Sequence, residues 1–298
     1  MIEMKEESTN QECDSVEFIK DFYLKGYVIL DSVFTTDEQA ELRSIVERLI
    51  DGANKKENQR NDGHWNSQGY LFNKRPEEVG SDDKMAQYLH KIQGVCTIEP
   101  SVLEKVFKHP NIMTTVRDIM KENSTPRTNT NINHNIDVFG TKFFPVYPGG
   151  NSVSWHQDSH YFGTGPSQQI ISCAVYIEKT NVENGCLRLI PGSHADCVEY
   201  PHTQGHGKWT QGEWVDVESN EDLKSRIKEV ICPRPGTVLL FDARLLHAAN
   251  ENISSDRTRW SFFAHYVPGN LDFSWRGIDF SRHRYKDRYT IENVITSI

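Results

Sequence analysis

The chain has 298 residues, of which 37% are hydrophobic and 25% charged, a composition typical of a globular protein with a large buried core. Its formal net charge of −9 argues against nucleic-acid binding as the main activity. No segment approaches the ~20 apolar residues that span a bilayer, and the polar N-terminus does not resemble a secretory signal. The six cysteines form no Cys-x-x-Cys pair, so we expect reduced thiols in a cytoplasmic protein that binds neither nucleic acid nor membrane.

The N-terminal region begins with a polar stretch, residues 1–14, that we expect to be a flexible tail. A short helical pattern follows and stops at Gly26, a residue type common just after helix ends. The apolar run 27–30 reads as a strand. Residues 35–39 carry two overlapping capping-box patterns ahead of apolar residues at helical spacing up to residue 50, which predicts an amphipathic helix.

Residues 51–81 are rich in Asn, Gln, Gly and charge, and they predict a long loop that contains Trp65 and Tyr70. Long loops with aromatic residues are either poorly ordered or functional lids. Two more helical patterns follow, near 83–92 and over 101–122, the second of which is interrupted by a proline. The first half of the chain therefore predicts a layer of helices.

From about residue 136 the pattern changes to short β-type runs separated by Gly, Pro and Asn. Such runs with few helices between them predict a sandwich or barrel. The polar segment 200–230 reads as an insertion. We therefore expect a mainly β protein with flanking helices and a single domain over 15–298. Its predicted parts are a helical layer (15–125), a β core (about 130–268) and a C-terminal extension (269–298).

The sequence His156-Gln157-Asp158 is the strongest chemical signal in the chain. Residues two apart in an extended segment point the same way, so His156 and Asp158 can approach one metal ion together. His247, which follows a turn and an apolar strand pattern, is the candidate third ligand. Two histidines and one carboxylate form the facial triad of non-haem iron(II) oxygenases, which leaves coordination positions open.

Three phrases together resemble the phytanoyl-CoA dioxygenase family: 156–158, 183–194 (ENGCLRLIPGSH), and 235–247 from Pro-Gly-Thr to the second histidine. An aromatic-Gly-strand lead-in followed by a helix, within residues 22–49, matches as well. The matches lie in the family's order over residues 18–267. The resemblance implies a double-stranded β-helix (a jelly roll, cupin-like) that uses Fe(2+), 2-oxoglutarate and O2, with ascorbate as reductant in vitro.

The resemblance also implies an arginine that binds the far carboxylate of 2-oxoglutarate. Arg259 matches its position, seven residues before an aromatic residue on the last strand, and Arg257 is the rival. Ser261 lies on the same strand face as Arg259 and could bind the same carboxylate. A second cationic contact could come from either of two lysines, Lys142 or Lys74.

The expected reaction is oxidation of a C–H bond in a small-molecule metabolite, with release of succinate and CO2. Because Asp158 is present where halogenating relatives lack the carboxylate, the resemblance favours a hydroxylase over a halogenase. Aromatic and histidine side chains near the motif or in the long loop are substrate-contact candidates: Trp155, His160, Tyr161, Trp65 and Tyr70.

Two alternative functions stay open at this point. One is a cupin-type metal enzyme without 2-oxoglutarate, which would not need Arg259, and the other is a non-catalytic β-barrel that binds a ligand. The basic stretch 275–288 is either a solvated tail or a segment near the barrel mouth that attracts an anionic substrate. The sequence does not determine the oligomeric state or the substrate.

Overall fold

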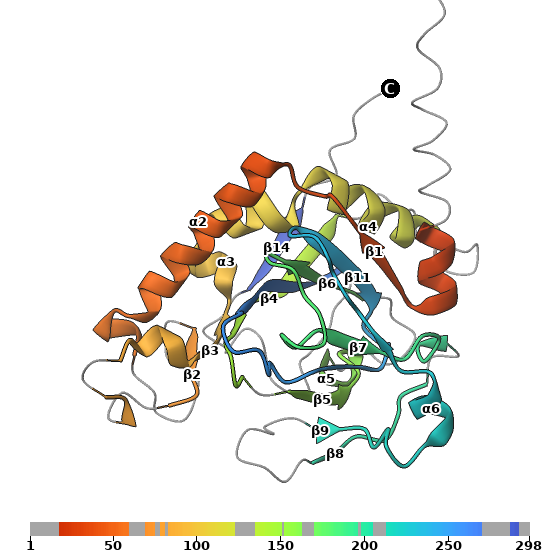
Figure 1. The fold of residues 1–298 in the computed structure, drawn as a ribbon. Helices are drawn as coiled ribbons and strands as arrows, with labels where there is room; N and C mark the ends of the chain where they lie inside the picture. The colour runs from red at the N-terminus through yellow and green to blue at the C-terminus, as the bar shows by residue number, and fades with distance from the viewer. Residues whose placement is uncertain are drawn as a thin grey trace, which may run out of the picture.

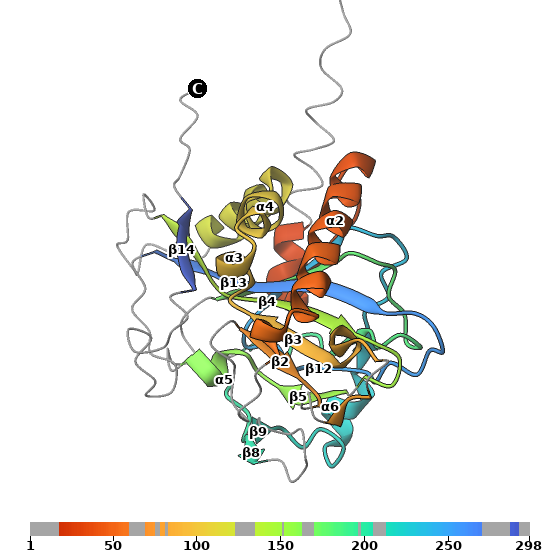
Figure 2. The same ribbon diagram turned by 90° about the vertical axis from the view of Figure 1, so that its left-hand side faces the viewer.

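Two antiparallel sheets face each other, and helices cover the outer face of the larger sheet (Figure 1). The computed structural model describes residues 18–59, 69–74, 78–80, 83–122, 135–150, 152–162, 170–195, 198–204, 213–269 and 287–291. The second view shows the helical layer on one side and the smaller sheet on the other (Figure 2). This arrangement is the double-stranded β-helix that the sequence predicts.

The larger sheet runs in the order β1-β11-β6-β13-β4-β3-β2, and β14 also pairs with β4. Its strands are β1 (Tyr27–Leu30), β2 (Tyr70–Phe72), β3 (Leu89–Gln93), β4 (Ile136–Val146), β6 (Ile171–Tyr176), β11 (Thr237–Asp242), β13 (Arg259–Pro268) and β14 (Arg288–Ile291). The smaller sheet, in the order β10-β7-β12-β5, consists of β10 (Lys228–Glu229), β7 (Leu187–Leu189), β12 (His247–Ala249) and β5 (Val153–His156). A separate pair joins β8 (Thr203–Gln204) to β9 (Glu213–Trp214).

Residues 18–25 are helical. The other helices are α2 (Thr36–Ala53), α3 (Val95–Ile98), α4 (Pro110–Glu122), α5 (Ser159–Phe162) and α6 (Glu221–Ser225). Shorter turns are the 3-10 helices η1 (Lys56–Asn58) and η3 (Met85–Tyr88) and the π-helix η4 (Leu103–Phe107). Helices α2, α3 and α4 lie over the outer face of the larger sheet (Figures 1 and 2).

Helix α2 begins at one of the two capping boxes that the sequence offers. Thr35 accepts a hydrogen bond from the backbone N–H of Glu38, and the Glu38 carboxylate accepts one from the backbone N–H of Thr35. Its apolar face is buried against the sheet and the other helices, through Leu42, Ile45, Val46 and Leu49. The predicted helix over residues 35–50 is therefore present and extends to Ala53.

The helix predicted near residues 83–92 is wrong in its second half. A single 3-10 turn, η3, leads into strand β3, which pairs with β2 and with β4. Pairing places Ile92 opposite Phe143, so the apolar residues that suggested a helix are instead buried by sheet neighbours. Tertiary pairing overrides a weak local pattern in short segments of this kind. The break predicted at Pro110 is present, between η4 and α4.

Three apolar layers organise the fold. The largest lies between the helices and the outer face of the larger sheet. A second fills the space between the two sheets and includes Tyr176, Leu239 and Phe241. A third covers the outer face of the smaller sheet, where the 213–227 segment packs. In the described residues the cysteines are free and buried, and none of the helices there has the length and apolarity needed to span a membrane.

The capping box gives a first test of the fold. Thr35→Ala removes the side-chain acceptor at the start of α2, and we expect it to lower the free energy of unfolding by about 1 kcal/mol. Urea denaturation followed by circular dichroism measures the change. Ser44→Ala, which removes a hydroxyl from an exposed position of the same helix, is the control and should change stability by less than ~0.5 kcal/mol. Equal stability of both variants would mean that Thr36 and Gln39 take over the cap.

Candidate metal centre

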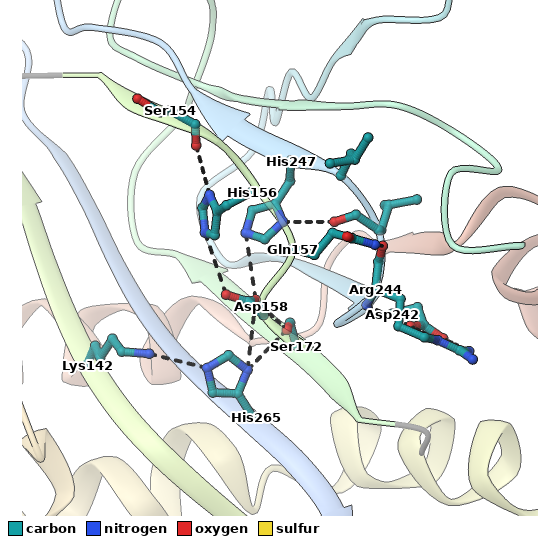
Figure 3. Close-up of polar contacts among 12 residues, drawn as sticks. Lys142, Ser154, His156, Gln157, Asp158, Ser172, Asp242, Arg244, His247 and His265 are labelled. Carbon is teal, nitrogen blue, oxygen red and sulfur yellow. Dashed lines mark hydrogen bonds and ion pairs between the residues drawn. The ribbon is translucent and has the colours of Figure 1, made fainter. Parts of the chain in front are cut away.

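The two histidines of the candidate triad lie opposite each other on neighbouring strands. His156 ends β5, His247 begins β12, and the antiparallel register pairs the two residues. Asp158 follows β5 and lies between them, 3.6 Å from each: its Oδ1 from His156 Nε2 and its Oδ2 from His247 Nε2 (Figure 3). These separations exceed hydrogen-bond length, but they allow one atom from each of the three residues to bind the same cation.

Both imidazole rings are oriented by the same backbone contact. His156 Nδ1 donates to the carbonyl of Ser154 at 2.8 Å, and His247 Nδ1 donates to the carbonyl of Leu245 at 3.0 Å. A carbonyl can only accept, so each ring carries a hydrogen on Nδ1, and Nε2 is the nitrogen that faces Asp158 and could bind a metal ion. Metal-binding histidines in proteins are fixed in this way.

The electrostatics of the three residues suit a metal ion. Burial lowers the pKa of His247 to about 4, so the ring is neutral at pH 7 and available as a ligand. Burial alone would raise the pKa of Asp158, but the adjacent histidines His247 and His156 hold it well below its usual value. Two imidazole nitrogens and an ionised carboxylate fit the facial triad of iron(II) sites, which leaves further coordination positions open.

An outer layer of side chains supports the carboxylate. Ser172 Oγ donates to Asp158 Oδ2 at 2.7 Å, and it lies 3.0 Å from His265 Nδ1. On the other side of that ring, Lys142 Nζ lies 3.2 Å from Nε2 (Figure 3). The sequence analysis did not single out Ser172 or His265, because neither stands in a recognisable motif; His265 lies six residues after Arg259 on β13.

Arg259 lies in the same barrel, at the start of β13. It is 6% exposed, and its guanidinium donates to the carbonyl of Gly185, while Nε has no hydrogen-bond partner among the described residues. Ser261 follows two positions later on the same strand face and pairs with Tyr176 of β6. The Tyr176 hydroxyl is also buried without a partner in the described part of the chain. Unsatisfied buried donors of this kind suit an anionic ligand.

Arg257, the other arginine that the sequence offers for this role, lies at the protein surface. Its side chain is 42% exposed and forms an ion pair with Glu183 at the surface. Of the two arginines, only Arg259 is buried inside the barrel. Tyr176 is a candidate that the sequence analysis missed, and the available signal was a hydroxyl at the end of a largely apolar strand.

Aromatic rings line the barrel interior beside the triad. The Phe241 ring lies 4.8 Å from His247 and 5.9 Å from Phe263, and Phe263 lies 6.4 Å from Phe144. Phe263 stands between Ser261 and His265 on β13, so these rings separate the arginine end of the barrel from the triad. Apolar walls of this kind exclude water from a reacting centre.

The two lysines proposed from sequence differ in position. Lys142 lies inside the barrel beside His265, whereas Lys74 is exposed and its ammonium lies 4.3 Å from the centre of the Tyr88 ring. A third lysine, Lys91 on β3, was not considered; burial, with help from the charge of Lys142, lowers its pKa to about 7. The structure therefore favours Lys142 over Lys74 as a residue of this site.

Residues 22–260 match the phytanoyl-CoA dioxygenase family. The chain belongs to this family. It is 22% identical over 250 residues to a probable alpha-ketoglutarate-dependent hypophosphite dioxygenase of Stutzerimonas stutzeri, covering 81% of this chain and 74% of that one. Two solved structures share its fold with TM-scores of 0.61.

One of these structures is EctD from S. alaskensis with 2-oxoglutarate and 5-hydroxyectoine, at 19% identity over 86% of this chain and 77% of that chain. The other is the non-heme alpha-ketoglutarate-dependent epimerase SnoN from nogalamycin biosynthesis, at 17% identity over 90% and 89% of the two chains. At these identities the structures bear on the fold alone, and they confirm the jelly-roll architecture.

The substrate-contact candidates of this dioxygenase-family chain separate in space. His160 and Tyr161 lie on α5 near the triad, with the Tyr161 ring 6.1 Å from His156. Trp155 alternates with His156 and is buried in the apolar layer outside the smaller sheet. Tyr70 is buried in the helical layer, stacked on Phe72. The structure therefore removes Trp155 and Tyr70 from the metal centre, and Trp65 lies outside the described residues.

Beside the triad, a second polar cluster joins His160, Glu199 and His202. His160 Nδ1 lies 2.7 Å from Glu199, and the two imidazoles are stacked at 3.7 Å. Although three ligand atoms converge here, both nitrogens of His202 are engaged, with the carbonyl of Tyr200 and the backbone N–H of Gln157. These contacts connect residues 199–202 to α5 and to Gln157. Because both nitrogens of His202 are already engaged, the cluster is a poor metal site.

Gln157, between the two metal-ligand candidates, connects this cluster to the triad. Its amide donates to the carbonyls of Val198 (2.9 Å) and Arg244 (2.6 Å), and its oxygen accepts from the N–H of Tyr200 (2.8 Å). Because Gln157 is fully buried, these contacts fix the segment 198–202 against the metal motif.

Replacing Gln157 by Met keeps its approximate volume but removes all three contacts. We expect a loss of about 3 kcal/mol in the free energy of unfolding, because buried groups lose their partners at ~1–3 kcal/mol each. We also expect faster proteolysis within 198–202. Gln87→Met, at an exposed position, is the control and should leave both measurements near wild type. If residues 198–202 were cleaved no faster in the Gln157→Met variant than in wild type, the role of Gln157 in fixing this segment would be contradicted.

The metal-free protein should lose stability in weak acid. Burial lowers the pKa values of His90, His202 and His247 to about 4, below the ~6.5 of an unfolded chain. The unfolded state then binds more protons, so the free energy of unfolding is highest above pH 6.5 and falls as the pH decreases towards 4. Urea denaturation across pH 4–8 measures this slope. His247→Gln should reduce the slope, and an unchanged slope would contradict the lowered pKa.

Proposed function

We propose that this chain is an Fe(II)- and 2-oxoglutarate-dependent dioxygenase that hydroxylates, or otherwise oxidises, a C–H bond of a small-molecule metabolite. Succinate and CO2 are the co-products. The observation that carries the proposal is a triad with free Nε2 atoms in the same barrel as a buried arginine whose Nε lacks a partner among the described residues. The family is one of dioxygenases, and its relatives named above use alpha-ketoglutarate.

His156, Asp158 and His247 are the residues that would hold iron(II). When bound, the iron activates O2 with electrons from the decarboxylation of 2-oxoglutarate. Three protein ligands on one face leave room for both of these reactants. Asp158 contributes the negative charge of the set, and its presence favours hydroxylation over halogenation.

Arg259 would bind the far carboxylate of 2-oxoglutarate. A guanidinium matches a carboxylate through two parallel hydrogen bonds, and burial strengthens such a pair. Burial lowers the pKa of Arg259, but an arginine stays protonated in proteins. Ser261 and Tyr176 lie on adjacent strands at this end of the barrel and could donate further hydrogen bonds. Lys142 lies nearer the triad and could bind a second anionic group.

The substrate itself does not follow from the family. Hypophosphite and 5-hydroxyectoine, named for two similar proteins, differ in charge and size. The epimerase among the similar structures indicates that one fold supports more than one outcome. His160 and Tyr161 are the described residues near the triad that we propose as substrate contacts.

The direct test is succinate formation in the absence of a known substrate. Purified protein with iron(II), ascorbate and 2-oxoglutarate under air should form succinate slowly, and His156→Ala should form none. Arg259→Gln should raise the KM for 2-oxoglutarate on the order of 100-fold, because a charge-assisted contact contributes ~1.5–3 kcal/mol. Arg257→Gln, two residues away and exposed, is the matched control and should behave as wild type.

Two results would contradict the proposal. Equal KM values for the Arg259 and Arg257 variants would remove 2-oxoglutarate from the arginine end and favour a cupin-type enzyme that does not use it. No succinate from wild type, together with no visible charge-transfer band in an anaerobic titration with iron(II) and 2-oxoglutarate, would favour a ligand-binding barrel.

A further inference from the structure

Strand β4 contains a bulge next to the metal centre. In its pairing with β13, Lys142 lies opposite Phe263 and Phe139 lies opposite His265. Three positions on β4 therefore span two on β13, which leaves one extra residue at 140–141. Gly140 has φ +62°, and a Cβ there would come within 3.0 Å of the His265 ring. The bulge thus requires glycine and lies directly against that histidine.

The C-terminal strand holds this bulge in place. Asp287, immediately before β14, is buried, and its carboxylate accepts from the Thr141 backbone N–H at 2.5 Å and from the Thr141 hydroxyl at 2.7 Å. The Gly140 N–H donates to the Asp287 carbonyl at 3.2 Å. A bulge interrupts the strand ladder, and Asp287 satisfies the groups that it leaves without strand partners.

The residue after the bulge, Lys142, begins a directed hydrogen-bond chain to the metal ligand (Figure 3). Ser172 has one hydroxyl hydrogen, and it is donated to Asp158. His265 Nδ1 must therefore donate to Ser172, so the neutral ring accepts at Nε2 from the Lys142 ammonium.

We propose that Asp287 is a positioning residue of the metal centre, which makes the C-terminal strand β14 a part of that centre. Asp287 fixes the bulge, the bulge presents Lys142 to His265, and His265 orients Asp158 through Ser172. The inference rests on the proposed function only in requiring that the triad bind a metal ion. Outer-layer residues of metal sites commonly change metal affinity about 10–100-fold.

The charges around the chain favour the same arrangement. Burial raises the pKa of Asp287 to about 7, against the opposing effects of Thr141 and Lys142. The pKa of Lys142 is lowered by burial, and the carboxylates of Asp158 and Asp287 oppose this. The ammonium therefore lies between two acids, one that binds the metal and one on β14. Lys142 therefore opposes the rise in the pKa of Asp287, and the two carboxylates oppose the fall in the pKa of Lys142.

Most of the basic C-terminal stretch, residues 275–288, lies outside the described residues. Of its arginines proposed to attract an anionic substrate, only Arg288 is described, and it contacts Asp137 at 2.5 Å. Arg282 and Arg284 lie outside the described residues. In the described part of this stretch, Asp287 is an acid, and its carboxylate contacts Thr141 on the bulge.

Cobalt(II) tests the proposal without catalysis, because its visible d–d spectrum reports the ligand geometry. Metal-free wild type, Asp287→Asn and Lys142→Met are each titrated with cobalt(II). Asparagine keeps the size of Asp287 but accepts poorly from two donors at once. We expect Asp287→Asn to shift the d–d bands and to weaken cobalt(II) binding about tenfold. We expect the double variant to bind no more weakly than Lys142→Met alone, since one residue acts through the other.

Arg288→Gln and Tyr289→Phe are the matched controls. They remove neighbouring β14 contacts, to Asp137 and Thr97, and should leave the cobalt spectrum and affinity unchanged. An unchanged spectrum and affinity in Asp287→Asn would overturn the proposal and leave β14 as a structural strand only. Strictly additive effects of Asp287→Asn and Lys142→Met would overturn it too.

A third pair of variants covers the case in which Asp287→Asn does not fold. Thr141→Val loses the hydroxyl contact to Asp287 and should shift the cobalt bands in the same direction, whereas Thr141→Ser keeps the hydroxyl and should restore the wild-type spectrum. Equal spectra for the Val and Ser variants would overturn the proposal. Failure of wild type to bind cobalt(II) would instead contradict the proposed function, so the two failures are distinguishable.

Discussion

The register between β5 and β12 is the constraint on which the candidate metal centre depends. It places His247 directly opposite His156, and Asp158 then falls between the two rings. A slip of one residue would turn one histidine to the other face of the sheet, because side chains alternate along a strand. The apolar layers on both faces of the smaller sheet oppose such a slip, since Trp155 must stay in the outer one.

Burial of charge inside the barrel imposes the second constraint. Asp158, Lys142 and Arg259 all lie where an unpaired charge is costly, so each needs partners or a ligand. Ser172 and His265 provide partners for Asp158 and Lys142. Arg259 keeps an unpaired Nε in the described structure, which is why we propose that end of the barrel for the anionic co-substrate. Burial of the surrounding apolar side chains offsets the free-energy cost of holding these charged groups inside the barrel.

Elements far from the triad in sequence supply much of its support. The outer-layer residues come from β4, β6 and β13, and Asp287 comes from the strand that ends the described chain. The 198–202 segment is fixed to the metal motif through Gln157. The candidate metal centre therefore depends on the whole barrel, although its three candidate ligands come from two places in the sequence, His156 and Asp158 in one motif and His247 at the start of β12.

The sequence by itself determined the local features. The triad candidates stand in recognisable phrases, and the capping box with its apolar period specifies α2, because these signals involve residues close in the chain. The jelly roll followed from strand-like runs together with the family resemblance. The helix predicted near 83–92 was wrong because pairing with β4, some fifty residues later, decides that segment.

Only the tertiary structure decided which side chains face the candidate metal centre. It moved Trp155 and Tyr70 into apolar layers and distinguished Lys142 from Lys74 and Arg259 from Arg257. It also brought Ser172, His265 and Asp287 to the site, although none of them belongs to a motif. The physical reason is that a side chain's direction depends on strand register and bulges, and long-range pairing sets both of these.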